Sequence, residues 1–183
     1  MKKAKRLVAI FSAFVFMLSA FAVSAFAVTV RVGPGWLVDN GGHMDWTGGT
    51  RYQADFDFAV RVWNNHRFVI RRVTFWTSAD VQVFDWFDDH PRSYTAFVDL
   101  TRRLIGNGGI NTGRMGFNTF QMDRLSPSPL QRRRMVALHE LGHTLGLADN
   151  LGIQNVMNPA DTTVNVLSPS DRASADAAWQ RFR

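Results

Sequence analysis

The sequence lacks cysteine altogether and contains a single glutamate, Glu140, among its 183 residues. Without cysteine the chain forms no disulfide bond and offers no thiolate for a metal site or for nucleophilic catalysis. The single glutamate excludes any mechanism that needs two. Lysine is also scarce, because it occurs only at positions 2, 3 and 5, so every later cation is arginine. With 46% hydrophobic and 20% charged residues, the composition is that of one packed globular domain.

The first 27 residues resemble an export signal. Four basic residues within the first six positions precede the apolar run Leu7–Phe21, and Ala25–Ala27 offers the small-x-small pattern that a signal peptidase cleaves. We therefore expect residues 1–27 to be a signal peptide and residues 28–183 to be a secreted catalytic domain. The alternative is an uncleaved anchor, since Leu7–Val28 is about long enough to span a bilayer.

Removal of the leader changes the charge of the chain. It takes away four of the 21 basic residues and none of the 15 acidic ones, so the formal net charge falls from +6 to +2. The high isoelectric point, about 10.7, therefore carries no argument for nucleic-acid binding. We expect no nucleic-acid partner, no membrane contact after cleavage, and a monomer.

The order of the predicted elements indicates an α+β domain. β-Branched and aromatic residues predict strands at Val28–Val32, Phe68–Trp76, Asp80–Trp86 and Met115–Phe120, with Tyr94–Ile105 ambiguous between strand and helix. The glycine-rich segment Asp39–Thr50 is expected to be a turn. Apolar periodicity and capping residues predict helices at Gln53–Asn64, from Pro129 after the cap Ser128 to the stop at Gly146, and at Pro169–Phe182 after the cap Ser168.

The second of these helices carries the sequence His139-Glu140-Leu141-Gly142-His143. Histidines four positions apart lie on one helical face, so two imidazole nitrogens can bind one Zn²⁺. Glu140 lies beside the first histidine and is suited to take a proton from the attacking water. The pattern H-E-x-x-H arises by chance in only about 7 of 10,000 sequences of this length and composition.

The third metal ligand is expected downstream of the helix. A glutamate ligand is excluded, and His43, His66 and His90 all lie well upstream. Gly146 and Asp149 extend the motif to H-E-x-x-H-x-x-G-x-x-D. A glycine there ends the helix and lets Asp149 turn back to the metal. Asp161 or Asp171 would take its place in an aspzincin-type protease. A non-catalytic secreted or anchored zinc-binding protein is the other alternative.

From residue 125 to 182 the chain resembles the metzincins, a clan of zinc endopeptidases. Asn155–Pro159 is similar to their methionine turn, and Leu167–Asp171 is similar to the closing segment of matrixins. An aspartate as third ligand is similar to the snapalysin group. The resemblance implies a zincin-like catalytic domain with a twisted mixed β-sheet, an active-site helix and a C-terminal helix.

The same resemblance implies the activity and the roles of residues. The activity is hydrolysis of protein or peptide substrates by a zinc endopeptidase. Zinc would be bound by His139, His143 and Asp149, with Glu140 as general base and Met157 supporting the site from beneath. Position 158, where some relatives carry a tyrosine, is asparagine, so oxyanion stabilisation would fall mainly to zinc.

Three further features have two interpretations each. Asp85, Asp88 and Asp89 could bind Ca²⁺, although a solvated loop is the favoured interpretation. The arginines at positions 132–134 could attract acidic substrates, although an exposed helix flank is favoured. The resemblance to metzincins implies that Met115–Phe120 is the edge strand that pairs with an extended substrate, whereas the residues alone indicate only a strand.

Overall fold

The computed structural model describes residues 28–33, 35–101, 112–126, 128–152, 154–160 and 163–181. They form an α+β fold built on a five-stranded mixed sheet with the strand order β2-β1-β3-β5-β4. The first four strands in this order are parallel, and β4 runs antiparallel to β5. The strands are β1 (His43–Gly48), β2 (Val69–Arg72), β3 (Val81–Trp86), β4 (Ala96–Thr101) and β5 (Thr112–Asn118). The expected α+β class is confirmed, whereas the predicted leader lies outside the described residues.

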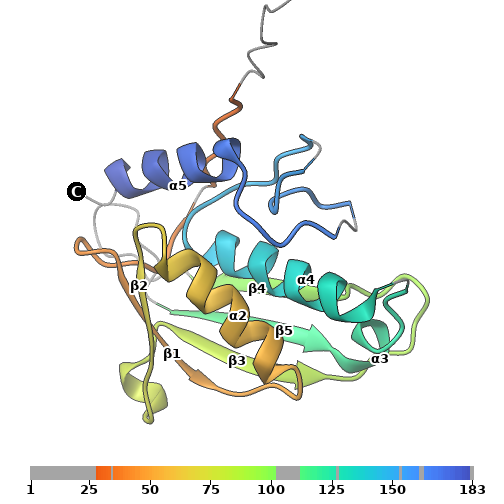
Figure 1. The fold of residues 1–183 in the computed structure, drawn as a ribbon. Coiled ribbons are helices and arrows are strands. Elements are labelled where there is room, and N and C mark those ends of the chain that lie inside the picture. Colours follow the sequence, from red (N-terminus) through yellow and green to blue (C-terminus); the bar gives the residue numbers. More distant parts are fainter. Residues whose placement is uncertain are drawn as a thin grey trace, which may run out of the picture.

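Helices α2 (Gln53–Asn64) and α4 (Pro129–Thr144) pack on one face of this sheet (Figure 1). The third longer helix is α5 (Pro169–Arg181), and the short ones are α3 (Thr119–Met122) and the 3-10 turn η1 (Trp76–Ser78). Helices α2 and α4 lie side by side, and α5 lies near the end of α2, where Asp176 pairs with His66 and Arg67. Within the described residues, no helix has the length and apolarity needed to cross a membrane.

The core lies between the sheet and helices α2 and α4. The ring of Trp46 on β1 contacts Phe56 on α2 edge to face, with centroids 4.7 Å apart. Trp63, fully buried on α2, donates its indole N–H to the carbonyl of Leu138 on α4 over 3.0 Å. This bond satisfies the one polar atom of a buried tryptophan and fixes α4 against α2.

The prediction for residues 39–50 is wrong in part, because His43–Gly48 forms strand β1 near the middle of the sheet. Flanking glycines concealed a short alternation in which Met44 and Trp46 point into the core, 0% and 3% exposed. The strand expected at Val28–Val32 is also wrong, since only Val32 forms a single bridge, to Leu147. The segment Tyr94–Ile105 resolves as strand β4 over Ala96–Thr101, and its last four residues lie outside the described ones.

The prediction that residues 115–120 form an edge strand is wrong. Strand β5 starts earlier, at Thr112, and ends at Asn118, and the two following residues begin α3. It lies between β3 and β4, so both of its edges are already hydrogen-bonded. The terminal strand on this side is β4. A sequence pattern predicts strands but not their order in the sheet. An extended substrate could pair with the outer edge of β4 and not with β5.

The predictions for the three longer helices are confirmed to within two residues. Helix α4 ends in a Schellman turn, in which Leu147 N–H donates to Gly142 O and Gly146, with φ +90°, donates to His143 O. The expected side-chain cap at Ser128 is not formed. Ser128 has a left-handed backbone, φ 62°, and contributes its carbonyl to Arg132 N–H instead.

Helix α5 begins with a reciprocal capping box. Asp171 N–H donates to Ser168 Oγ over 3.0 Å, and Ser168 N–H donates to Asp171 Oδ2 over 2.8 Å. The same carboxylate, which is fully buried, also accepts the backbone N–H groups of Val156 (3.0 Å) and Met157 (3.4 Å). Asp171 therefore ties the predicted methionine turn to the start of α5.

The arginines at positions 132–134 are not simply an exposed flank. Arg133 Nε lies 3.0 Å and Arg134 Nε 3.6 Å from the carboxylate of Asp55 on α2, and Asp55 is only 4% exposed. Their guanidinium groups also lie over the rings of Tyr52 and Phe58. Two of the three arginines thus join α4 to α2, which removes the basis for attraction of acidic substrates.

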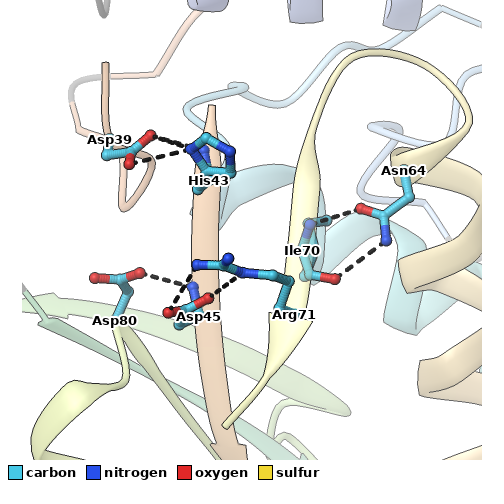
Figure 2. A network of polar contacts seen from close by, with 7 residues as sticks. All are labelled: Asp39, His43, Asp45, Asn64, Ile70, Arg71 and Asp80. Atoms are coloured by element: carbon cyan, nitrogen blue, oxygen red, sulfur yellow. Dashed lines mark hydrogen bonds and ion pairs between the residues drawn. The ribbon is translucent and has the colours of Figure 1, made fainter. Parts of the chain in front are cut away.

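Polar side chains also hold the β1–β2 side of the sheet (Figure 2). Asn64, the last residue of α2, accepts from Ile70 N–H and donates to Ile70 O on strand β2. Arg71 forms a two-point ion pair with Asp45 on β1, at 2.9 and 3.2 Å. Strand β2 is the terminal strand on this side of the sheet. The amide of Asn64 therefore forms hydrogen bonds with the outer edge of β2 in the way that a neighbouring strand would.

We expect Asp171→Asn to lower the free energy of unfolding by about 2–3 kcal/mol, because an amide nitrogen would face backbone N–H donors at a buried position. Chemical denaturation with urea measures the loss. The matched control is Asp89→Asn, the same change at an exposed aspartate, which should alter stability by less than about 0.5 kcal/mol. Equal stability of the two variants would contradict the role assigned to Asp171.

Candidate metal centre

Helix α4 brings the two histidines of the motif together. His139 and His143 lie one helical turn apart, and their Nε2 atoms approach to 3.1 Å. Each Nδ1 lies 3.0 Å from a backbone carbonyl, that of Val156 for His139 and that of Leu147 for His143. A proton on Nδ1 that is donated to the carbonyl leaves a lone pair on Nε2. Both imidazoles therefore direct a lone pair to the same point.

Asp149 brings the third donor to that point. After the turn at Gly146 the chain runs back along α4, and Asp149 Oδ1 lies 3.3 Å from His139 Nε2 and 3.4 Å from His143 Nε2. The sequence-predicted ligands His139, His143 and Asp149 thus form one group that could hold a metal ion. It is the only such group of three or more among the described residues.

The spacing of the three donor atoms fits a small cation. Two lone pairs and a carboxylate oxygen 3.1–3.4 Å apart repel one another unless a positive charge lies between them. A triangle of this size places an ion about 2 Å from each donor, which is the bond length of imidazole and carboxylate ligands to zinc. The geometry and the donor chemistry therefore agree with a divalent metal.

Burial shifts the pKa of two residues at this site, His139 and Glu140. Burial lowers the pKa of His139, and the neighbouring His143 lowers it further, while the hydrogen bond to Val156 and the charge of Asp149 oppose the shift. A neutral imidazole is the form that binds a metal. Burial also raises the pKa of Glu140 to about 8, with a further contribution from the charge of Asp149. A cation bound nearby would act in the opposite direction on Glu140.

A pocket of about 530 Å³ opens over the three donors. It is lined by residues of α4, including Glu140, and by residues 93–96, which lead into the terminal strand β4. Leu125, Met135 and Val136 give the pocket an apolar part, and Asn158 and Pro159 of the predicted methionine turn also line it. The three donors therefore face an open space that is large enough for a substrate.

The wall formed by residues 93–96 is held by Asn118, a residue that sequence reasoning missed. Asn118 is fully buried at the end of β5, and its amide nitrogen donates to Asp88 O, Ser93 Oγ and Tyr94 O. Its amide oxygen accepts from Asp88 N–H and Phe120 N–H. No local signal in the sequence marks this asparagine, because all its partners but one lie 24 or more positions away.

Tyr94 is a second residue that sequence reasoning missed. It lies far upstream of the motif, yet it lines the pocket, and its side chain is 77% exposed. The sequence offered no tyrosine near the methionine turn, so oxyanion stabilisation was assigned mainly to zinc. The structure places this exposed tyrosine in the lining of the pocket, available for contact with a bound molecule.

Met157 packs beneath the helix that carries the histidines. It is 1% exposed, and a Cβ atom built on Gly142 would lie 2.3 Å from its sulfur. Gly142 lies between His139 and His143 in the motif, so the missing side chain is what lets Met157 approach the backbone of α4 here. The position of Met157 agrees with the packing role that the resemblance implies.

The N-terminal segment supports the loop that carries Asp149, which the sequence did not reveal. Gly33 N–H donates to Gly146 O over 2.7 Å, and Leu37 N–H donates to Thr144 O over 2.8 Å. Beyond Asp149, the side chain of Asn150 donates to Thr29 O, and its backbone N–H donates to Met157 O. The third donor is therefore held between the start of the described chain and the methionine turn.

The other residues considered from sequence take no part in this centre. Asp171 holds backbone N–H groups, as described above, and Asp161 lies outside the described residues. The carboxylate of Asp85 accepts from Thr50 Oγ1 and Arg51 N–H, and that of Asp88 accepts from His90 N–H in its own loop, so a calcium site there stays a prediction. The remaining histidines contact other partners: His43 contacts Asp39, His66 contacts Asp176, and His90 accepts from Arg92 N–H.

Comparison with known proteins identified no relative: no family model matches the chain, and no curated protein matches it. Inference of function therefore depends on the motif and on the geometry of the metal centre.

We expect Asp149→Ala to weaken divalent-metal binding by more than about 100-fold, because loss of a ligand exceeds the 10- to 100-fold effect of losing an outer partner. Titration of the metal-free protein with Zn²⁺ and Co²⁺ measures the affinity. Asp161→Ala is the matched control and should bind as the wild type does. If Asp149→Ala retains the metal and Asp161→Ala loses it, Asp149 is not the third ligand.

We expect Gly142→Ala to destabilise the protein by about 1–3 kcal/mol through overpacking against Met157, despite the higher helix propensity of alanine. Thermal and urea unfolding measure the change. Gly49→Ala serves as the control, because its added Cβ would meet nothing closer than Gln53 Oε1 at 3.8 Å. A neutral or stabilising effect at Gly142 would show that Met157 does not pack tightly there.

Proposed function

We propose that the chain is a secreted zinc-dependent endopeptidase of the metzincin type. The single observation that carries the proposal is the convergence of His139, His143 and Asp149 in a pocket that is also lined by the only glutamate of the chain. The leader-like pattern in residues 1–27 supports export. The mixed sheet, the helix with the two histidines and the C-terminal helix are the elements that the resemblance to metzincins implies.

The donor set supports zinc as the metal. Two imidazoles and one carboxylate are ligands that zinc accepts in catalytic sites, where three protein ligands leave a fourth position open. When bound, zinc acidifies water and polarises a carbonyl oxygen. The pocket over the three donors supplies the open side, whereas a structural zinc site is closed by four protein ligands. This openness favours a catalytic site over a purely structural one.

Glu140 would move the protons of the reaction. Its carboxylate accepts a proton from the attacking water and returns it to the amine nitrogen of the departing peptide, so one residue serves both steps. Burial beside the donors keeps competing water from its carboxylate, and it is the only glutamate in the sequence. If Glu140 is lost, no other glutamate of the chain can act as general base in its place.

The substrate would bind in an extended form along β4. This strand ends the sheet beside the pocket, so its outer backbone groups are available for pairing with a peptide. Leu125, Met135 and Val136 would then receive an apolar side chain next to the cleaved bond. The lining holds no lysine or arginine, so it offers no partner to an acidic side chain.

We expect Glu140→Gln to lower kcat for peptide hydrolysis by about 10²- to 10⁴-fold, because the variant loses the general base but keeps the shape of the side chain. Casein, gelatin and a fluorogenic peptide with an apolar residue after the cleaved bond serve as substrates. Zinc content, measured by mass spectrometry in the same samples, should stay equal to that of the wild type.

Two outcomes would contradict the proposal. If the wild type binds zinc yet cleaves nothing across a broad peptide library, the chain is a metal-binding protein without peptidase activity. If Glu140→Gln cleaves as fast as the wild type, the activity is real but the base is another group. Gln121→Glu, which adds a carboxylate outside the pocket lining, controls for a general effect of charge.

A further inference from the structure

A turn between β2 and β3 exposes two adjacent aromatic side chains to water. Residues 74–78, here called the aromatic tip, include Phe75 and Trp76, which are 72% and 76% exposed. All five residues of the tip are exposed, and none of them lines the metal pocket. Large apolar groups gathered at one exposed place mark interaction sites in soluble proteins.

The tip has a fixed backbone. Its 3-10 turn is closed by Ser78 N–H and Ser78 Oγ, which both donate to Phe75 O, and by Ala79 N–H, which donates to Trp76 O. At its base, Val73 N–H donates to Trp46 O over 2.8 Å. The tip is therefore an ordered turn, and its backbone hydrogen bonds hold the two rings in an exposed position.

A second set of bonds holds the far side of the base (Figure 2). Asp80 N–H donates to Asp45 O over 2.7 Å, and the carboxylate of Asp80 accepts Asp45 N–H over 2.7 Å. Arg71 pairs with the Asp45 side chain. The two ends of the turn are thus anchored on strand β1, and the tip projects from the end of the sheet (Figure 1).

A hollow of about 490 Å³ lies beside the tip. It is lined by Thr47 and Gly48 of β1, by Arg72, and by Val73 and Thr74 at the start of the turn. The Arg72 guanidinium lies over the Trp46 ring and donates to Gly48 O, contacts that hold it in place without a carboxylate. A guanidinium next to two threonines is suited to bind phosphate oxygens.

The charge of the segment points to the same class of ligand. Residues 67–79 contain three arginines and no acidic residue. Two of these arginines are paired, Arg67 with Asp176 and Arg71 with Asp45, whereas the described contacts of Arg72 involve a carbonyl and a ring. The positive charge next to the two aromatic rings is therefore centred on Arg72.

We propose that the aromatic tip docks on anionic membrane surfaces. Trp76 enters the headgroup region, where its amphipathic ring is favoured, Phe75 adds apolar surface beside it, and Arg72 binds a lipid phosphate in the adjacent hollow. A projecting tip fits a lipid interface, which deforms around it, better than it fits a protein surface without a matching groove. The inference does not depend on peptidase activity, and it departs from the expectation that the mature chain has no membrane contact.

Sedimentation with large vesicles tests the proposal. The purified protein should bind vesicles of phosphatidylcholine with 30% phosphatidylglycerol, and it should bind pure phosphatidylcholine at least about fivefold less, because an arginine near an anionic surface contributes about one kcal/mol. Phe75→Ser with Trp76→Ser should lower binding to the anionic vesicles by more than about tenfold. Arg72→Gln should remove most of the preference for anionic lipid.

Phe87→Ser is the matched control, because Phe87 is 68% exposed on another loop and should leave binding unchanged. Comparison of variants with the same N-terminus cancels any contribution of residues 1–27. Thermal melts check that all variants remain folded, which the exposure of the substituted rings favours. Wild-type binding without preference for anionic lipid, or an equal loss in Phe87→Ser, would overturn the proposal.

The depth of Trp76 gives an independent test. Brominated lipids should quench part of the tryptophan fluorescence of the bound wild type, and Trp76→Phe should still bind while losing that quenching. Quenching that persists in Trp76→Phe would place another tryptophan in the membrane and contradict the assignment. Dimerisation in the absence of lipid that Phe75→Ser with Trp76→Ser abolishes would assign the tip to a second copy of the chain instead.

Discussion

The mutual repulsion of three electron-rich atoms is the constraint around which this fold is arranged. Two imidazole nitrogens and a carboxylate oxygen within 3.4 Å of one another form a group that could hold a cation, and in its absence their repulsion must be opposed by the rest of the fold. The Schellman turn at Gly146 returns the chain toward the histidines. The hydrogen bonds of Gly33 and Leu37 then fix the returning loop.

The same constraint explains why α5 matters to a centre that it does not enter. The buried carboxylate of Asp171 accepts the N–H of Val156, and the carbonyl of that residue accepts the hydrogen bond of His139 Nδ1. The N–H on the other side of that carbonyl's peptide group, that of Met157, also donates to Asp171, so the ring orientation of His139 depends on backbone that is held by the first turn of α5. Met157, next in sequence, packs against Gly142 between the two histidines, so hydrogen bonding and packing act on the same short segment.

Sequence patterns predicted the parts of this centre that are local and missed the parts that depend on strand order. The helix with His139 and His143, its end at Gly146 and the return of Asp149 were predictable because each depends on residues within one or two turns. Strand β1 was hidden by glycines, and β5 was taken for an edge because alternation does not reveal neighbours. Tyr94 lines the pocket, and Asn118 holds the segment that carries Tyr94, only because strands far apart in sequence pair in the sheet, which no local pattern encodes.

The two terminal strands of the sheet, β2 and β4, differ in how their outer edges are occupied, and the difference agrees with the proposed function. Strand β2 is only four residues long, and the side chain of Asn64 occupies the backbone N–H and carbonyl of Ile70, which protects that side from pairing with other chains. Strand β4 is six residues long and runs beside the pocket as the last strand in the order. Among the described residues, no backbone hydrogen bond reaches the outer edge of β4. This agrees with the proposed peptidase, because an extended substrate could pair there and pass its backbone over the three donors.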